Sequence, residues 1–68
     1  MKIGITVNGA PRETEPDISL FEFIQQLGFD PMGVAALVND EIVERSGFAE
    51  TLLKENDVVE LIRFVPGG

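Results

Sequence analysis

The sequence predicts an α+β domain in which a mixed sheet of four to five strands packs on one main helix. Three observations support this class. Apolar residues alternate near the N-terminus, they recur at helical spacing over residues 20–27, and the last strand-like segment is rich in β-branched residues. The chain has 68 residues. That length suits one small domain and leaves no room for a core that encloses a deep active site.

The first two elements are predicted to form a β-hairpin. Apolar residues occupy every second position over residues 3–7, which is typical of a strand with one buried face. Asn8-Gly9 follows, the strongest short-range signal for a hairpin turn. A second strand is expected over about residues 11–15. Because it is polar and contains Pro11, we expect it at an edge of the sheet.

A helix is predicted over about residues 19–27. Ser19 and Glu22 have the Ser-x-x-Glu spacing of a capping box, and Ile18 and Phe23 occupy the two hydrophobic-staple positions around it. The apolar stripe at the three- and four-residue spacing consists of Leu20, Phe23, Ile24 and Leu27. Gly28 can adopt the left-handed conformation that ends a helix.

The second half of the chain is predicted to add three strands. Residues 34–38 read as a buried strand, Asn39-Asp40 as a two-residue turn, and residues 41–44 as a short return strand. Residues 58–65 form the last predicted strand.

The segment over residues 45–56, between the predicted strands at residues 41–44 and 58–65, has a weaker pattern of apolar residues. Phe48, Leu52 and Leu53 are expected to form one turn of helix that packs on the core.

Composition excludes several classes of function. The net charge is −7, from 12 acidic and 5 basic residues, which argues against nucleic acid and against an anionic membrane surface. The chain has no Cys and no His, so it lacks thiolate chemistry and the commonest general base. A cation site at Asp40, Glu41 and Glu44 is disfavoured, because these residues read as the solvated end of a hairpin. No metal site is therefore expected.

No segment of the sequence indicates a membrane or an export signal. The N-terminus lacks a long apolar run, and no stretch approaches the roughly 20 apolar residues of a membrane helix. We therefore expect a cytoplasmic protein that is a monomer when free.

The sequence ends in Gly67-Gly68, which directs attention to the C-terminus. Glycine has no side chain, so its carboxylate can enter a narrow slot in another enzyme. We expect a domain over residues 1–65 followed by a flexible tail over residues 66–68. An incidental frayed tail is the alternative interpretation.

The predicted order of elements is that of the β-grasp, or ubiquitin-like, fold. Within that fold the chain resembles the ThiS/MoaD family of sulfur carriers, above all its ThiS branch. The resemblance covers essentially the whole chain. Its segments are Val7-Asn8-Gly9, the block from Val34 to Val43, Arg45-Ser46, and the end "LKENDVVELIRFVPGG". The chain departs from many ThiS sequences at Pro66, where they have a third small residue.

The resemblance implies a carrier and co-substrate, not an enzyme. In such carriers a ThiF-like partner uses ATP to adenylate the terminal carboxylate, here that of Gly68. Sulfur then displaces AMP, and the thiocarboxylate supplies sulfur to a ThiG-like thiazole synthase in thiamine biosynthesis. The chain has no G-x-x-x-x-G-K phosphate loop. We therefore expect it to bind no cofactor, with ATP held by the partner.

The last strand is the second functional candidate. Alternation places Val59, Leu61, Arg63 and Val65 on one face and Val58, Glu60, Ile62 and Phe64 on the other. The ubiquitin-like register implies that Val59 and Leu61 point inward. Ile62 and Phe64 would then form an exposed docking surface with Val65 and Pro66, and Arg63 would pair with an acidic residue of the partner. Packing of Phe64 into the rim of the core is the alternative.

Other functions remain open on the sequence. The carried sulfur can be used to make molybdopterin or another sulfur-containing metabolite instead of thiazole. The chain can also be a non-reactive ubiquitin-like binding module, in which Gly67 and Gly68 are dispensable.

Overall fold

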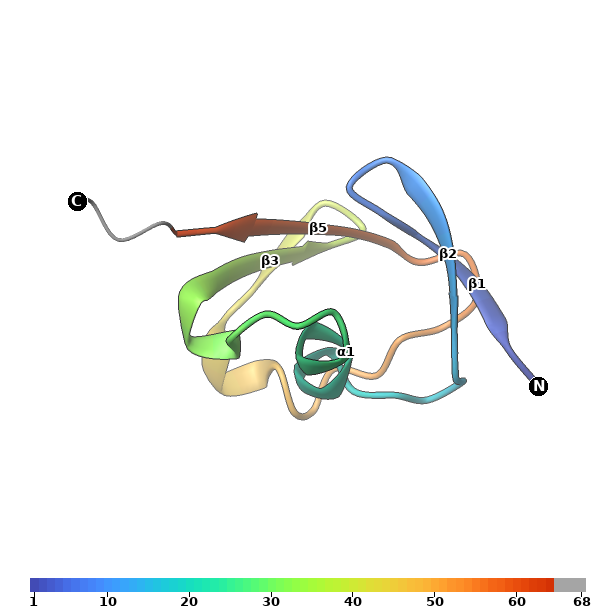
Figure 1. The fold of residues 1–68 in the computed structure, drawn as a ribbon, viewed down its shortest axis with the longest axis horizontal. Helices are drawn as coiled ribbons and strands as arrows, with labels where there is room; N and C mark the ends of the chain where they lie inside the picture. The colour runs from blue at the N-terminus through green and yellow to red at the C-terminus, as the bar shows by residue number, and fades with distance from the viewer. Residues whose placement is uncertain (65–68) are drawn as a thin grey trace.

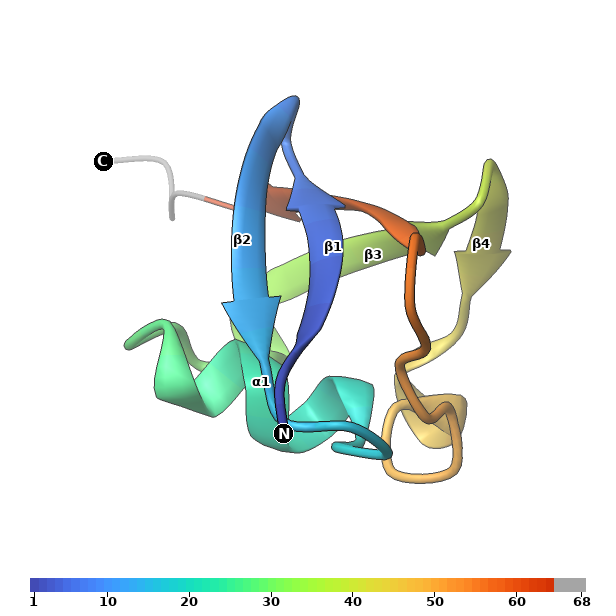
Figure 2. The same cartoon turned by 90° about the vertical axis from the view of Figure 1, so that its right-hand side faces the viewer.

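A five-stranded mixed sheet in the order β2-β1-β5-β3-β4 carries the fold (Figure 1). The structure is a computed structural model that describes residues 1–64. The strands are β1 (Ile3–Val7), β2 (Ala10–Thr14), β3 (Val34–Val38), β4 (Glu41–Val43) and β5 (Val58–Arg63). Strand β5 lies in the centre, parallel to β1 and antiparallel to β3. One helix, α1 (Leu20–Gln26), packs across one face of this sheet (Figure 2). The predicted α+β class and β-grasp arrangement are confirmed.

Two left-handed turns build the two hairpins. Asn8 and Gly9 have φ of 50° and 83°, and Asn39 and Asp40 have φ of 52° and 70°. Two successive residues with positive φ give the turn whose twist matches that of paired strands. Both hairpins are therefore located where the sequence predicts them, and the polar strand β2 lies at a sheet edge as expected.

Helix α1 begins and ends at the predicted signals. The Ser19 hydroxyl accepts a hydrogen bond from the Glu22 N–H at 3.1 Å, which satisfies a donor of the first turn. At the other end the Gly28 N–H donates to the Gln25 carbonyl and the Phe29 N–H to the Ile24 carbonyl. This bond pair defines a Schellman motif, with Gly28 at φ 88°.

The core lies between α1 and one face of the sheet. Phe23, Ile24, Val59 and Leu53 are almost completely buried there. The connection from β4 to β5 closes the side of this core, starting with the single 3₁₀ turn η2 (Arg45–Gly47). Phe48 follows that turn and is 1% exposed.

The prediction that Leu52 packs on the core is wrong. Leu52 is 47% exposed, whereas its neighbour Leu53 is fully buried. The chain is extended here, because the Leu53 N–H donates to the Ile18 carbonyl and the Leu20 N–H to the Thr51 carbonyl. Adjacent side chains of an extended segment point in opposite directions, so only one of the two leucines can enter the core. The helical turn ends before them, at Gly47.

Strand β5 presents its two faces as predicted. Val59 and Leu61 are buried, while Val58, Ile62 and Phe64 are exposed. Described pairing ends at Arg63, and the expected continuation to Val65 lies outside the described residues.

The domain boundary at residue 65 and the tail over residues 66–68 lie outside the described part of the chain. Within residues 1–64, no helix has the length and apolarity needed to cross a membrane.

Candidate functional site

The strand that leads to the glycine pair is anchored up to its last described residue. The Phe64 N–H donates to the Gly33 carbonyl at 2.9 Å. Gly33 ends the 3₁₀ turn η1 (Pro31–Gly33). The Arg45 guanidinium donates to the Pro31 carbonyl at 3.3 Å and to the Met32 carbonyl at 3.1 Å. The point from which the last four residues depart is therefore held by β3 and by η1.

Large apolar side chains are exposed on the outer face of the sheet beside that point. Ile62 is 53% and Phe64 is 58% exposed, as the sequence predicts. Pairing of Ile62 with Ala35, and of Ile42 with Leu37, adds three further side chains to the same face. We call this set the outer-face patch; it consists of Ala35, Leu37, Ile42, Ile62 and Phe64.

Ile42 is the member of this patch that sequence reasoning missed. It is 78% exposed. An isoleucine in a short, otherwise polar hairpin segment is a sequence signal for an exposed apolar side chain. The position of Ile42 beside Leu37 follows only from the register of β3 and β4. An isolated exposed apolar residue needs no explanation, whereas a contiguous set is typical of a docking surface.

A hollow of about 380 Å³ lies at the end of β5, on the side of α1. Its lining residues are Phe29, Asp30, Val34, Arg63 and Phe64, together with Gly28 and Gly33. The Arg63 guanidinium carbon lies 4.9 Å from the centre of the Phe29 ring, within range of a cation–π interaction. Arg63 stays exposed although it follows the buried face of β5. It therefore places a positive charge in this hollow beside Phe64, the last described residue.

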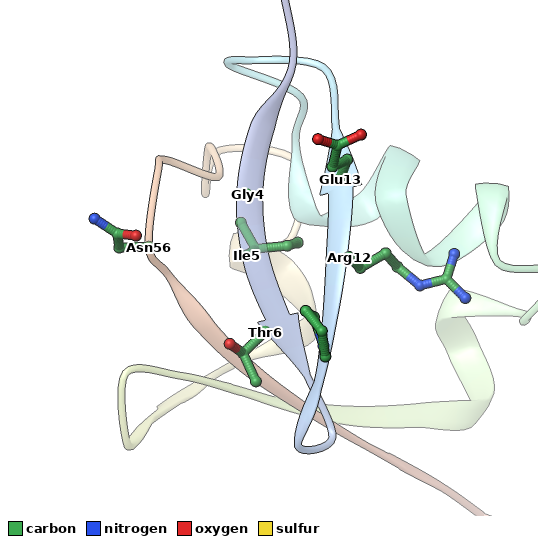
Figure 3. A pocket seen from close by; sticks show the side chains of 7 residues that line it. Gly4, Ile5, Thr6, Arg12, Glu13 and Asn56 are labelled. Atoms are coloured by element: carbon green, nitrogen blue, oxygen red, sulfur yellow. The ribbon is translucent and has the colours of Figure 1, made fainter.

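The larger hollow, about 540 Å³, lies over the hairpin of β1 and β2. In Figure 3 its polar side chains Arg12 and Asn56 point to opposite sides of the hairpin. A small-molecule site needs a few convergent polar groups in an enclosed apolar pocket. This arrangement does not provide them.

The remaining predicted residues divide into those that are described and those that are not. Val65, Pro66, Gly67 and Gly68 lie outside the described residues. Among residues 1–64, no three His, Cys, Asp or Glu side chains are grouped to hold a metal ion. The described chemistry of the site is therefore an apolar surface that also carries Glu60, with Asp30 and Arg63 in the hollow at the end of β5.

These features define a small ubiquitin-like β-grasp domain with an exposed apolar face on its last strand. The chain matches the ThiS family over residues 5–68. It is 33% identical over 64 residues to the sulfur carrier protein ThiS of Thermus thermophilus, covering 94% of this chain and 98% of that protein. The chain belongs to the ThiS family of sulfur carriers.

Two other similarities concern structure and domain context. The crystal structure of the thiamine biosynthesis protein ThiS from Geobacter metallireducens superposes with a TM-score of 0.83 at 30% identity, covering 97% of this chain and 100% of that one. A thiazole synthase of Magnetococcus marinus is 34% identical over 64 residues, covering 94% of this chain and 20% of that protein. This chain thus spans about a fifth of that relative's length.

Proposed function

We propose that this chain carries sulfur as a thiocarboxylate on Gly68 and donates it to thiazole formation in thiamine biosynthesis. A ThiF-like partner catalyses attack of the Gly68 carboxylate on the α-phosphorus of ATP, and pyrophosphate leaves. Sulfide (HS⁻) derived from cysteine then attacks the acyl carbon, AMP leaves with the electrons of its bond to that carbon, and loss of the sulfur-bound proton gives the thiocarboxylate. The chain acts as a co-substrate, because both catalysis and the ATP site belong to the partner.

One observation carries this proposal. The family match extends through residue 68, so it includes the glycine pair together with the strand that precedes it. That strand ends in exposed Ile62 and Phe64. A reactive terminus next to an apolar surface suits a carrier that must dock before its terminus can react.

The proposed acceptor is a thiazole synthase. A protein of that name contains a stretch similar to this whole domain within a chain about five times as long. A ThiS-like segment within a thiazole synthase chain supports association of the two activities. The use of ATP favours the cytoplasm as the place where the carrier works.

The outer-face patch is the proposed docking surface for the ThiF-like enzyme, together with Val65 and Pro66. Burial of large apolar side chains supplies most of the energy of such contacts. Arg63 is close enough to the start of the tail to pair with an acidic residue of the partner, and the acidic remainder of the domain favours an electropositive rim.

Isotope exchange between pyrophosphate and ATP tests this proposal, because it reports adenylation without any later step. We expect exchange by the ThiF-like enzyme to require this chain and to disappear when Gly68 is deleted. Phe64→Asp is expected to raise the half-saturating concentration of the carrier by about tenfold or more, because a charge on the docking surface must be desolvated.

Leu52→Asp is the matched control for Phe64→Asp. Leu52 is similarly exposed but pairs with Ser19 at the start of α1 and is not part of the outer-face patch, so the half-saturating concentration should stay within about twofold. Equal exchange with and without Gly68 would refute adenylation. Unfolding of Phe64→Asp in circular dichroism would assign Phe64 to the core rim instead of the docking surface.

A further inference from the structure

The side chain of Asn8 pairs with strand β5 as a backbone peptide group would. Its Oδ1 accepts a hydrogen bond from the Leu61 N–H at 2.8 Å, and its Nδ2 donates to the Leu61 carbonyl at 3.2 Å. The Asn8 backbone N–H also donates to the Val59 carbonyl at 2.9 Å. One turn residue therefore satisfies three backbone groups of the strand that leads to the glycine pair.

Strand β5 needs these bonds because its neighbour β1 ends early. The two strands pair only at Thr6 with Val58 and at Val7 with Val59. After Val7 the chain turns away into the hairpin with β2 (Figure 3), whereas β5 continues to Arg63.

Leu61 is the first residue of β5 that this early end would leave unpaired on the side of β1. Backbone groups of successive residues in a strand point to opposite sides. The Phe64 N–H bonds to Gly33 on the side of β3, so the N–H and C=O of Leu61 face the side from which β1 has departed. Without the Asn8 amide, only β3 would hold this end of β5.

We propose that Asn8 is a positioning residue, which fixes the end of β5 and with it the direction in which the glycine tail leaves the domain. It acts through Leu61 and needs no contact with the activating enzyme. The inference rests on the proposed function for its role in the reaction. Its structural part, the clamping of the strand up to Phe64, stands independently.

Asn39 provides a matched control in the same molecule. It too is a hairpin-turn asparagine with positive φ, 52° against 50° for Asn8. Its Oδ1 accepts from the Val58 N–H at 2.9 Å, and its own N–H donates to the Val58 carbonyl at 2.7 Å. Both asparagines thus bond to the backbone of β5, Asn39 at its first residue and Asn8 further along, at Val59 and Leu61. The Asn39 Nδ2 donates to the Asp57 carboxylate at 3.0 Å instead of to β5.

The kinetic test compares Asn8→Gly with Asn39→Gly. Glycine accepts the positive φ of both turns, so each variant removes the amide without straining the backbone. We expect similar losses of stability for the two variants in urea unfolding.

We also expect Asn8→Gly to raise the KM for the carrier in pyrophosphate exchange by about five- to tenfold at unchanged kcat. Without the Asn8 amide, the tail should point less often in the direction that the enzyme binds, which raises KM. Once the enzyme has bound the tail, the reaction proceeds as before, so kcat is unchanged. Asn39→Gly should stay within about twofold of the unmodified chain.

A similar KM for the two variants would overturn the inference, because loss of stability alone then explains the effect. An unmodified chain that supports no exchange would refute the proposed function, not the role of Asn8. Amide hydrogen exchange decides that role directly.

In the hydrogen-exchange test, Asn8→Gly should lower the protection of the Phe64 amide by at least about tenfold more than Asn39→Gly does. Equal protection of the Phe64 amide in the two variants would show that the Asn8 side chain does not stabilise the part of the strand after Leu61.

Discussion

Leu52 and Leu53 show how much depends on the direction of one side chain. They are adjacent and chemically identical, yet one is half exposed and the other fully buried. The difference follows from two backbone hydrogen bonds to Ile18 and Leu20, which hold the segment extended. Leu53 therefore fills a place in the core that Leu52 cannot reach.

Truncation of each leucine to alanine tests this assignment. Leu53→Ala should lower the free energy of unfolding by about 2–5 kcal/mol, because it removes buried methyl groups and leaves a cavity. Leu52→Ala should change it by about 0.5 kcal/mol or less. Urea unfolding followed by circular dichroism measures both. Equal losses would mean that the segment is helical in solution and that both leucines share the core.

At the scale of the element, the end of α1 combines a special backbone angle with open space. Gly28 has φ 88°, and a Cβ built on it would meet nothing within 4 Å. Gly33 also has open space around its Cβ position but lacks a positive φ. Crowding is therefore absent at both glycines, and the positive φ of Gly28 is the feature in which the two positions differ.

Gly28→Ala should lower the free energy of unfolding by about 1–2 kcal/mol, since an L-residue is disfavoured in the left-handed region. Gly33→Ala should be neutral or raise it by about 0.5 kcal/mol, because alanine reduces the entropy of the unfolded chain. Thermal unfolding of both variants checks the difference. A Gly28→Ala variant as stable as Gly33→Ala would contradict the Schellman geometry.

The elements that sequence reasoning located are those with their own local signal. The turn at Asn8-Gly9 depends on the positive φ of these two residues, and the cap at Ser19 and the stop at Gly28 depend on bonds to nearby residues. These three signals can therefore be recognised without the rest of the fold. The segment that contains Leu52 has no such signal, and long-range bonds to the start of α1 decide its form.

The candidate site was predictable only along one strand. Alternation within β5 is enough to place Ile62 and Phe64 on one face. The contribution of Ile42 depends on the register of β3 and β4. The bonds of Asn8 to Leu61 join residues 53 positions apart, so a turn signal alone could not reveal them.

At the scale of the whole molecule, the sheet order places the strand that leads to the glycine pair in the centre of the domain. Strand β5 lies in the centre of the sheet and ends at the end of the molecule away from Met1 (Figure 1). Its buried face joins it to the core through Val59 and Leu61, while its other face stays available for docking. The strand that leads to the glycine pair is thus also the central strand of the sheet, paired with β1 and β3 and buried on one face.

The central claim is that Gly68 carries sulfur, and intact mass spectrometry tests it most directly. The chain is incubated with a ThiF-like enzyme, ATP and a sulfur source. The account predicts a mass gain equal to the exchange of one oxygen for one sulfur, mapped to Gly68 and absent when Gly68 is deleted. An unchanged mass, with no ATP-dependent release of AMP, would contradict it and would favour a non-reactive binding module.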